Sequence, residues 1–485
     1  MASSLVEASH PVDEKSLQDL SPHYTPQHSR LISLDVIKGI AVLAGLFFAI
    51  FAWAGISRGM QGAVLQQRHG STHVLQVLVS LLFEDKMRTL LVLAFGASML
   101  LVLVRQHPGS RFSNQELLIR RNFTLLVFGI INGILFLWPY DILYGLGIVG
   151  VIFFAFTRMG ARGLYIAALL TVLIGCGKIY WNYNDDQKAY KKFLVVETKE
   201  KKIKADSVKL KDSLKTGFKK TDTLTWKQKE EKGAWEGISK KFKWEKKNDS
   251  GQIKALQDGR YTKVYDQQLG TTQQRESMWF FQFGFWQFAA ALLLGMALFK
   301  SGFFNGKFTV TQHLIIFLVT LFAGFFLFRV RMHGWDDSIK DYTLYVKTRP
   351  LPGDLFKPLE ILLMALAYAS LVMIFIQKEW LSPVTRLLST VGRMALSNYL
   401  LQSILLGTLF YGYGMGYYAR IPQNWLYFIV LEMIIIQIVF SVFWLRYYYV
   451  GPAEWLVTSV SKGRKQPFRI KPADQTGPSQ DLQTI

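Results

Sequence analysis

The chain has 485 residues, of which 51% are hydrophobic, 14% aromatic and 19% charged, and its formal net charge is +22. A soluble core of this size does not need so many uninterrupted apolar runs, so the composition excludes an ordinary soluble protein and predicts an all-α polytopic membrane protein. A single cysteine, Cys176, excludes a disulfide framework.

The chain begins with a polar, proline-containing lead and then becomes strongly apolar. Residues 1–33 contain no apolar block, so we expect a disordered cytoplasmic N-terminus and no cleavable signal peptide. Ten apolar segments then predict about ten membrane helices. They are roughly residues 34–56, 89–104, 117–138, 142–156, 164–180, 279–299, 310–328, 359–376, 394–413 and 425–445. The fourth segment and the stretch 73–83 are short enough for half-helices or interfacial helices.

A lysine-rich insertion, 182–275, separates an N-terminal bundle (34–181) from a C-terminal bundle (276–446), which is followed by a cytoplasmic tail (447–485). The insertion supplies nearly half of the net charge, and its apolar residues recur at helical spacing, which predicts amphipathic helices. It is either a basic cap that attracts anionic lipid or a surface polymer, or a solvated insertion without a specific partner. It shows no nucleic-acid-binding motif, and we expect no nucleic-acid partner.

Basic residues gather in the short loops on one side of the predicted bundle. They are Arg105, Arg111, Arg120, Arg121, Arg158, Arg162, Lys300, Lys307, Lys378, Arg386 and Arg393. The positive-inside rule makes this the cytoplasmic side. We therefore expect both termini in the cytoplasm and the insertion outside.

Asp35 and Lys38 lie three residues apart at the start of the first apolar segment. Together on one helix face, they are suited to bind a charged headgroup or the phosphates of a donor. The alternative is an Asp that interacts with the helix dipole and a Lys that reaches the interface. The spacing does not choose between these interpretations.

A second group of charges belongs to the outer side. Lys86 and Arg88 precede the second apolar segment, and Asp141 lies in the tight turn between the third and fourth. Charges at the same membrane depth can pair, so Lys86 and Arg88 are candidate binding residues. Asp141 is a candidate general base or part of a proton path, or it is only a helix N-cap.

The stretch GRMALSNYLLQS (392–403) places Asn398 and Gln402 on one face of an apolar helix, with Arg393 just before them. Such amides face the protein interior, where they either bind substrate or join helices. His313 is the one histidine near membrane depth. No phosphate loop, nucleophile elbow or metal-ligand spacing is present, so the sequence predicts no cofactor and no metal site.

Several motifs resemble the YeiB-type family of bacterial integral membrane proteins, a domain family of unknown function. They are SLDVIKGIAVL (33–43), FEDKMRTLLVLAFG (83–96), YDIL (140–143), GRMALSNYLLQS (392–403), FYGYGMG (410–416) and GPAEWLVTSVSKGRKQP (451–467). The resemblance implies a multi-pass protein of the bacterial inner (plasma) membrane. The lysine-rich insertion lies outside these motifs.

The first-span motif of this family is similar to that of membrane acyltransferases, including heparan glucosaminide acetyltransferase and the polysaccharide O-acetyltransferases. By this resemblance Asp35 and Lys38 occupy the positions of an Asp and an Arg. A deeper polar position of those relatives falls on Ala49, and a His that is usual in the third span of YeiB-type proteins falls on Asn132. A chain without both groups has either lost acyl-transfer chemistry or relies on Asp141.

Two function classes therefore remain open. In the first, an acyl group passes from a cytoplasmic donor such as acetyl-CoA, held by Asp35, Lys38 and Arg393, to an outer acceptor activated near Asp141. The acyl group would move along the polar face of Asn398 and Gln402. In the second, the same face lines a path for a small solute, and Asp35 and Asp141 gate or couple its passage. A membrane protein that acts through contacts alone is the third interpretation.

Overall fold

The computed structural model describes residues 31–55, 71–105, 112–213, 224–242 and 250–470. Within these ranges the chain is helical and forms no strand, which confirms the predicted all-α membrane protein. Eight helical segments are long and apolar enough to cross a membrane, and two shorter apolar helices accompany them. Together they correspond to the ten predicted segments. Most of the predicted lead, Arg111 and the last part of the predicted tail lie outside the described residues.

The first half of the chain forms α2 (Ile32–Trp53), α4 (Ser71–Leu82), α5 (Lys86–Val104), α6 (Asn114–Ile134), α7 (Leu143–Ile152), η1 (Phe153–Arg158) and α8 (Ala161–Ser213). Next come α9 (Trp226–Phe242), α10 (Ser250–Asp258), α11 (Tyr261–Gln274), η2 (Arg275–Gly284), α12 (Phe285–Ser301) and η3 (Phe303–Asn305). The last part forms α13 (Val310–Lys340), α14 (Tyr342–Thr348), α15 (Lys357–Gln377), α16 (Ser382–Arg393), α17 (Ala395–Phe410), α18 (Gln423–Tyr447) and α19 (Pro452–Lys462).

The centre of the bundle is the pair α5 and α12. In the two segments that contain them, 67% of the apolar window is buried, against 22% for α13 and for α18, which therefore lie at the periphery. The two central backbones approach closely at glycines: a Cβ added at Gly96 would lie 2.2 Å from the carbonyl oxygen of Leu292. A Cβ at Gly295 would lie 2.0 Å from that of Leu93. Small residues permit such close packing between membrane helices.

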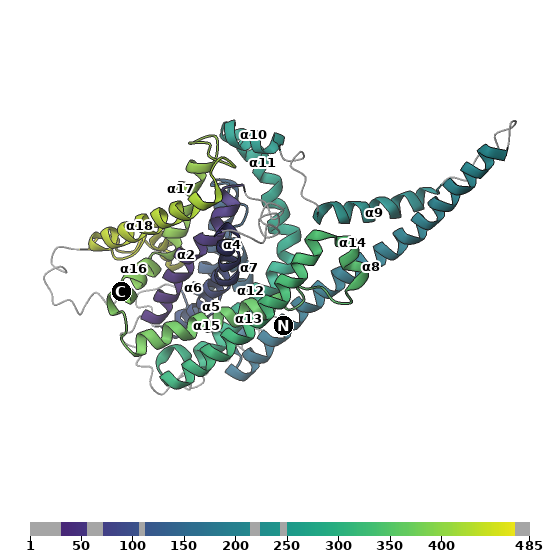
Figure 1. The fold of residues 1–485 in the computed structure, drawn as a ribbon. Coiled ribbons are helices and arrows are strands. Elements are labelled where there is room, and N and C mark those ends of the chain that lie inside the picture. Colours follow the sequence, from purple (N-terminus) through teal and green to yellow (C-terminus); the bar gives the residue numbers. More distant parts are fainter. Residues whose placement is uncertain (1–30, 56–70, 106–111, 214–223, 243–249, 471–485) are drawn as a thin grey trace, which may run out of the picture.

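The lysine-rich insertion continues a membrane helix. The 53-residue helix α8 runs on past the predicted boundary at residue 182 without a break, and α9 packs back against it. Figure 1 shows α8 and α9 projecting from the bundle as a hairpin. An aromatic cluster holds the base of this hairpin, where the ring centroid of Trp235 lies 4.9 Å from that of Tyr190 and 6.0 Å from that of Tyr342.

The end of the insertion returns to the bundle. Gln257 of α10 donates to the carbonyl oxygen of Tyr418 at 2.7 Å, and Tyr261 of α11 donates to that of Leu135 at 2.8 Å. These bonds hold α10 and α11 over the connection between α6 and α7 and over the loop after α17. Figure 1 shows the two helices at that end of the bundle.

The bundle has two ends that differ in the residues they carry. The start of α2, all of α16 and the tail helix α19 lie at one end, which we call the α16 end. The end of α2, the start of α5 and the connection between α6 and α7 lie at the other, which we call the Asp141 end. Trp53, at the last turn of α2, stacks on Trp138 of that connection with centroids 4.3 Å apart.

The tail helix α19 is fixed to α17 by a buried carboxylate. Glu454 accepts hydrogen bonds from the backbone N–H groups of Leu396 and Ser397, at 2.7 and 3.2 Å, and from the Ser397 hydroxyl. It thereby satisfies the first turn of α17, whose N–H groups have no partner within their own helix. Ser397 in turn accepts from the N–H of Ala453 at 3.0 Å.

We predict that Glu454→Ala lowers the free energy of unfolding by about 2 kcal/mol, because several buried donors lose their acceptor. The single cysteine, Cys176, is 9% exposed, so a thiol-reactive dye reports unfolding during a thermal scan in detergent. Glu230→Gln, at an exposed position on α9, is the control. An unchanged melting temperature for Glu454→Ala would contradict this role.

Candidate functional site

The connection between α6 and α7 folds back into the bundle and carries Asp141. The Asp141 carboxylate accepts a hydrogen bond from Asn132 Nδ2 at 2.7 Å and another from the N–H of Tyr144 at 2.7 Å. It lies against Gly129, where an added Cβ would be 2.8 Å from Oδ2. The bond to Tyr144 in the first turn of α7 resembles helix capping. Asn132, which the family resemblance aligns with a His, is thus a direct hydrogen-bond partner of Asp141.

Tyr399 of α17 closes the other side of this carboxylate. Its hydroxyl accepts from Trp138 Nε1 at 3.2 Å and from the N–H of Ile142 at 3.0 Å, and it also hydrogen-bonds Asp141. The stretch 392–403 therefore reaches Asp141 through its tyrosine. Sequence reasoning missed Tyr399, although it stands beside Asn398 in the motif that drew attention.

The Asp141 carboxyl has an unusual proton affinity. It lies between α6 and α7, outside the membrane-spanning helices. Burial raises the pKa of Asp141 to about 7, although the hydrogen bonds from Tyr144, Asn132 and Tyr399 act to lower it. A carboxyl with such a pKa exchanges its proton near neutral pH, as a general base must.

A small cavity of about 20 Å³ opens beside Asp141. Its charged walls are Arg88, Asp141, Arg275 and Glu276, and aromatic rings, including those of Tyr140 and Trp279, form much of the rest. This volume suits a group about the size of one water molecule.

The π-helix η2 supplies four of the residues that line the cavity. It joins α11 to α12 and carries Arg275, Glu276, Trp279 and Phe280. Segments of π-helix are rare and often occur at functional sites, because the wider turn redirects side chains. Glu276 lies against Gly133 of α6, where an added Cβ would be 2.8 Å from Oε1. Arg275 and Glu276 were not singled out from the sequence. The feature that could have identified them is their position as a charged pair just before an apolar segment.

Both carboxylates therefore rest on one glycine face of α6. Gly129 and Gly133 are one turn apart, so Asp141 and Glu276 lie side by side along the helix. They are close enough to repel each other electrostatically.

The two arginines of the cavity are held by different means. Arg88 pairs with Asp85 at 2.8 Å and donates to Gln287 Oε1 at 3.2 Å. The Arg275 guanidinium lies 4.2 Å from the ring centroid of Tyr140 and 4.2 Å from that of Trp279. Stacking on aromatic faces fixes the orientation of a guanidinium.

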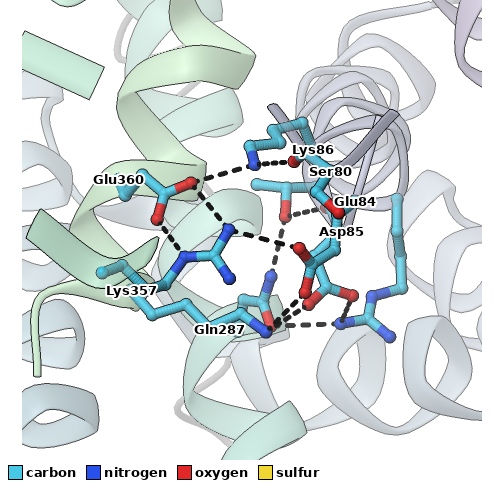
Figure 2. Close-up of polar contacts among 10 residues, drawn as sticks. Ser80, Glu84, Asp85, Lys86, Gln287, Lys357 and Glu360 are labelled. Carbon is cyan, nitrogen blue, oxygen red and sulfur yellow. Dashed lines mark hydrogen bonds and ion pairs between the residues drawn. The ribbon is translucent and has the colours of Figure 1, made fainter. Parts of the chain in front are cut away.

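A buried ion network joins α5, α13 and α15 (Figure 2). Lys86 Nζ lies 2.9 Å from Glu360, and the side chains of both residues are 0% exposed. Arg331 Nε lies 2.7 Å from the same carboxylate. Lys86 also donates to the carbonyl oxygen of Ser80 at 2.7 Å. Lys86, predicted as a binding residue, thus belongs to the network and does not line the cavity.

The network continues to the break between α4 and α5. Glu84 pairs with Arg331 at 3.2 Å and with Lys357 at 3.3 Å, and Lys357 also pairs with Asp85 at 2.9 Å. Asp85 has a left-handed backbone, with φ of 56°, which turns the chain into α5. Because Asp85 also binds Arg88, the network reaches the cavity wall.

The amides of α17 join helices. Asn398 donates to the Ser441 hydroxyl at 2.8 Å, and Gln402 donates to Gln437 Oε1 at 2.9 Å. Both amides are buried and connect α17 to α18, which is the interhelical arrangement that the sequence allowed. Neither contributes to the cavity wall beside Asp141.

The remaining predicted residues lie at the α16 end. Asp35 is 5% exposed and is packed under Gly392, while Lys38 is half-buried one turn further along α2. Arg393 donates to the carbonyl oxygen of Tyr449 at 3.1 Å. Asp35 is 18 residues before Trp53, which corresponds to about 27 Å of helix. The structure thus brings Arg88 and Asp141 together and leaves Asp35, Lys38 and Arg393 at the opposite end.

Two further positions, Ala49 and His313, do not line the cavity beside Asp141. Ala49 adds only a methyl group to an apolar cluster. His313 is 0% exposed, and its ring centroid lies 4.6 Å from that of Phe303. Among the residues that the structure describes, no group of three or more His, Cys, Asp or Glu could hold a metal ion.

We predict that Glu360→Gln lowers the free energy of unfolding by about 3 kcal/mol, because Lys86 and Arg331 would then be buried without their shared counter-charge. The dye-based melting temperature measures the effect. Glu379→Gln, at an exposed position just beyond α15, should change little. If Glu360→Gln and Glu379→Gln both have the melting temperature of the native protein, the network does not stabilise the bundle.

Comparison with known proteins relates the chain to uncharacterised proteins. Residues 298–464 match the model of a family described as "Protein of unknown function (DUF418)". The chain is 27% identical to "Uncharacterized protein YeiB" of Escherichia coli (strain K12) over 88% of its own length and 95% of that relative. It is 38% identical to "Uncharacterized protein YxaH" of Bacillus subtilis (strain 168), over 21% of the chain and 26% of that relative. No solved structure matches.

Proposed function

We propose that this chain, which is similar to YeiB over most of its length, transfers an acyl group to an acceptor bound in the cavity beside Asp141. The observation that carries the proposal is a carboxyl with a pKa of about 7 on the wall of a polar cavity. A general base works best when its pKa lies near the working pH.

In the proposed reaction, Asp141 takes the proton from a hydroxyl or amine of the acceptor as that atom attacks the acyl carbonyl carbon. The carbon–sulfur bond of a thioester donor breaks, and the proton then passes from Asp141 to the leaving thiolate. Asn132 and the N–H of Tyr144 hold the carboxylate in position throughout. Arg88 and Arg275 bind an anionic part of the acceptor.

The phosphates of an acyl donor such as acetyl-CoA would bind at the α16 end, which the positive-inside rule assigns to the cytoplasm. The rest of the donor would then have to extend along the bundle, over about 27 Å of helix, for its thioester to reach Asp141. Lys38 and Arg393 lie at that end and suit the phosphates of such a donor. Asp35 does not suit them, because its carboxylate would repel phosphate. Its part in this proposal is to support the two cations without touching the donor.

We predict that Asp141→Asn lowers the rate of acyl incorporation by about 100-fold or more, because the amide cannot accept the proton. The assay follows a radiolabelled acyl group from acyl-CoA into membrane material in vesicles that contain the protein. Asp266→Asn, at an exposed position on α11, is the matched control. Native incorporation by Asp141→Asn, or no incorporation by the native protein, would refute acyl transfer through Asp141.

The pH dependence provides a second test. Only the ionised form of Asp141 accepts a proton, so the rate should rise with pH and level off above about 7, the pKa of this group. Below that pH it should fall about tenfold for each pH unit. Initial rates at saturating donor give the profile. A rate that is constant from about pH 5 to about pH 8 would contradict a base with this pKa.

Transport of a small solute is the second candidate. Several helices of the bundle are interrupted: α4 and α5 are separated by a break, α7 and α17 are short, and η2 is a π-helix. Of these, α5, α7 and η2 contribute residues to the cavity wall. Interrupted helices commonly form the binding sites of transporters. Proteoliposomes that accumulate a solute with no acyl incorporation would favour this candidate over acyl transfer.

A further inference from the structure

We propose that the cavity beside Asp141 recognises the headgroup of a zwitterionic membrane lipid that carries a primary ammonium and a phosphate, the chemistry of an ethanolamine phosphodiester. The ammonium enters between Asp141 and Glu276, and the phosphate lies at the mouth beside Arg88 and Arg275. This inference identifies the acceptor of the proposed acyl transfer. Binding of the headgroup does not depend on that function, and only the acylation of its amine rests on it.

The acidic wall suits an ammonium. Asp141 and Glu276 lie side by side on Gly129 and Gly133 and repel each other, so a cation between them lowers the electrostatic energy. Glu276 Oε1 is buried and accepts no hydrogen bond from the described part of the chain. A primary ammonium offers three N–H donors to such oxygens, whereas a trimethylated one offers none.

The basic wall suits a phosphate. Arg88 is held by Asp85 and Gln287, and Arg275 is stacked on Tyr140 and Trp279. A guanidinium fixed in this way binds phosphate with paired N–H donors in a set orientation. Arg88 and Arg275 on one wall and Asp141 and Glu276 on the other give each end of a zwitterion a partner of opposite charge, whereas a simple anion or cation would find only one such partner.

The size of the cavity and its surroundings favour a lipid over a free zwitterion. A volume of about 20 Å³ holds the ammonium alone, so the rest of the ligand must lie outside. The neighbouring surface is apolar: Met278 and Phe281 of η2 are 61% and 50% exposed, and Leu135 after α6 is 55% exposed. Such a surface faces the bilayer, so a lipid whose acyl chains pack on it is already placed to present its headgroup to the cavity.

The test measures headgroup binding without any acyl donor. Full-length protein in nanodiscs of phosphatidylcholine receives increasing fractions of phosphatidylethanolamine or phosphatidylglycerol, or soluble phosphoethanolamine, and Cys176 labelling reports the melting temperature. We expect a saturable rise with phosphatidylethanolamine and none with phosphatidylglycerol. Equal stabilisation by both lipids would overturn the proposal, and equal potency of soluble phosphoethanolamine would overturn its assignment to a lipid.

Two variants connect this binding to the cavity. Glu276→Gln removes one carboxylate, and Gly133→Ala pushes the same carboxylate away from α6 without touching Asp141. Each should raise the phosphatidylethanolamine fraction needed for half-maximal stabilisation by about tenfold, while Asp266→Asn should not. An unchanged response in both variants would overturn the proposal.

The proposed reaction and this inference can fail separately. Binding of phosphatidylethanolamine without acylation of its amine would refute the proposed reaction alone. Acylation of another acceptor, without binding of phosphatidylethanolamine, would refute this inference alone.

Discussion

The architecture depends on keeping several charges paired inside an apolar bundle. Glu360 receives both Lys86 and Arg331, and Glu84 connects Arg331 to Lys357. Charged groups out of contact with water are tolerated only when they are paired and hydrogen-bonded. Because the partners come from α5, α13 and α15, satisfying them sets how these helices lie relative to one another.

That constraint extends to the candidate site through one aspartate. Asp85 binds Lys357 of the network on one side and Arg88 of the cavity on the other. Asp85 therefore connects the network directly to a residue that lines the cavity. The break between α4 and α5 is what allows this, since it places Glu84 and Asp85 outside regular helix, where both can turn toward α15.

Small residues have the complementary role of creating space. Gly129 and Gly133 leave room on α6 for two carboxylates, and the π-helix η2 directs Glu276 into that room. A tyrosine from α17 closes the other side of Asp141. With Arg88 of α5, the site is thus assembled from four regions that are distant in the sequence, while the amides of α17 serve to attach α18.

The sequence by itself determined the membrane class, the ten apolar segments and the grouping of Lys86, Arg88 and Asp141 at one end, because bilayer thickness requires apolar runs of a set length. Only the tertiary structure decided which charges pair and which line the cavity. Lys86 pairs with Glu360, and Arg88 lines the cavity. Glu276 lies beside Asp141, and Tyr399 hydrogen-bonds it. Such partners depend on the rotation of each helix and on contacts between distant segments, and hydropathy carries no information about either.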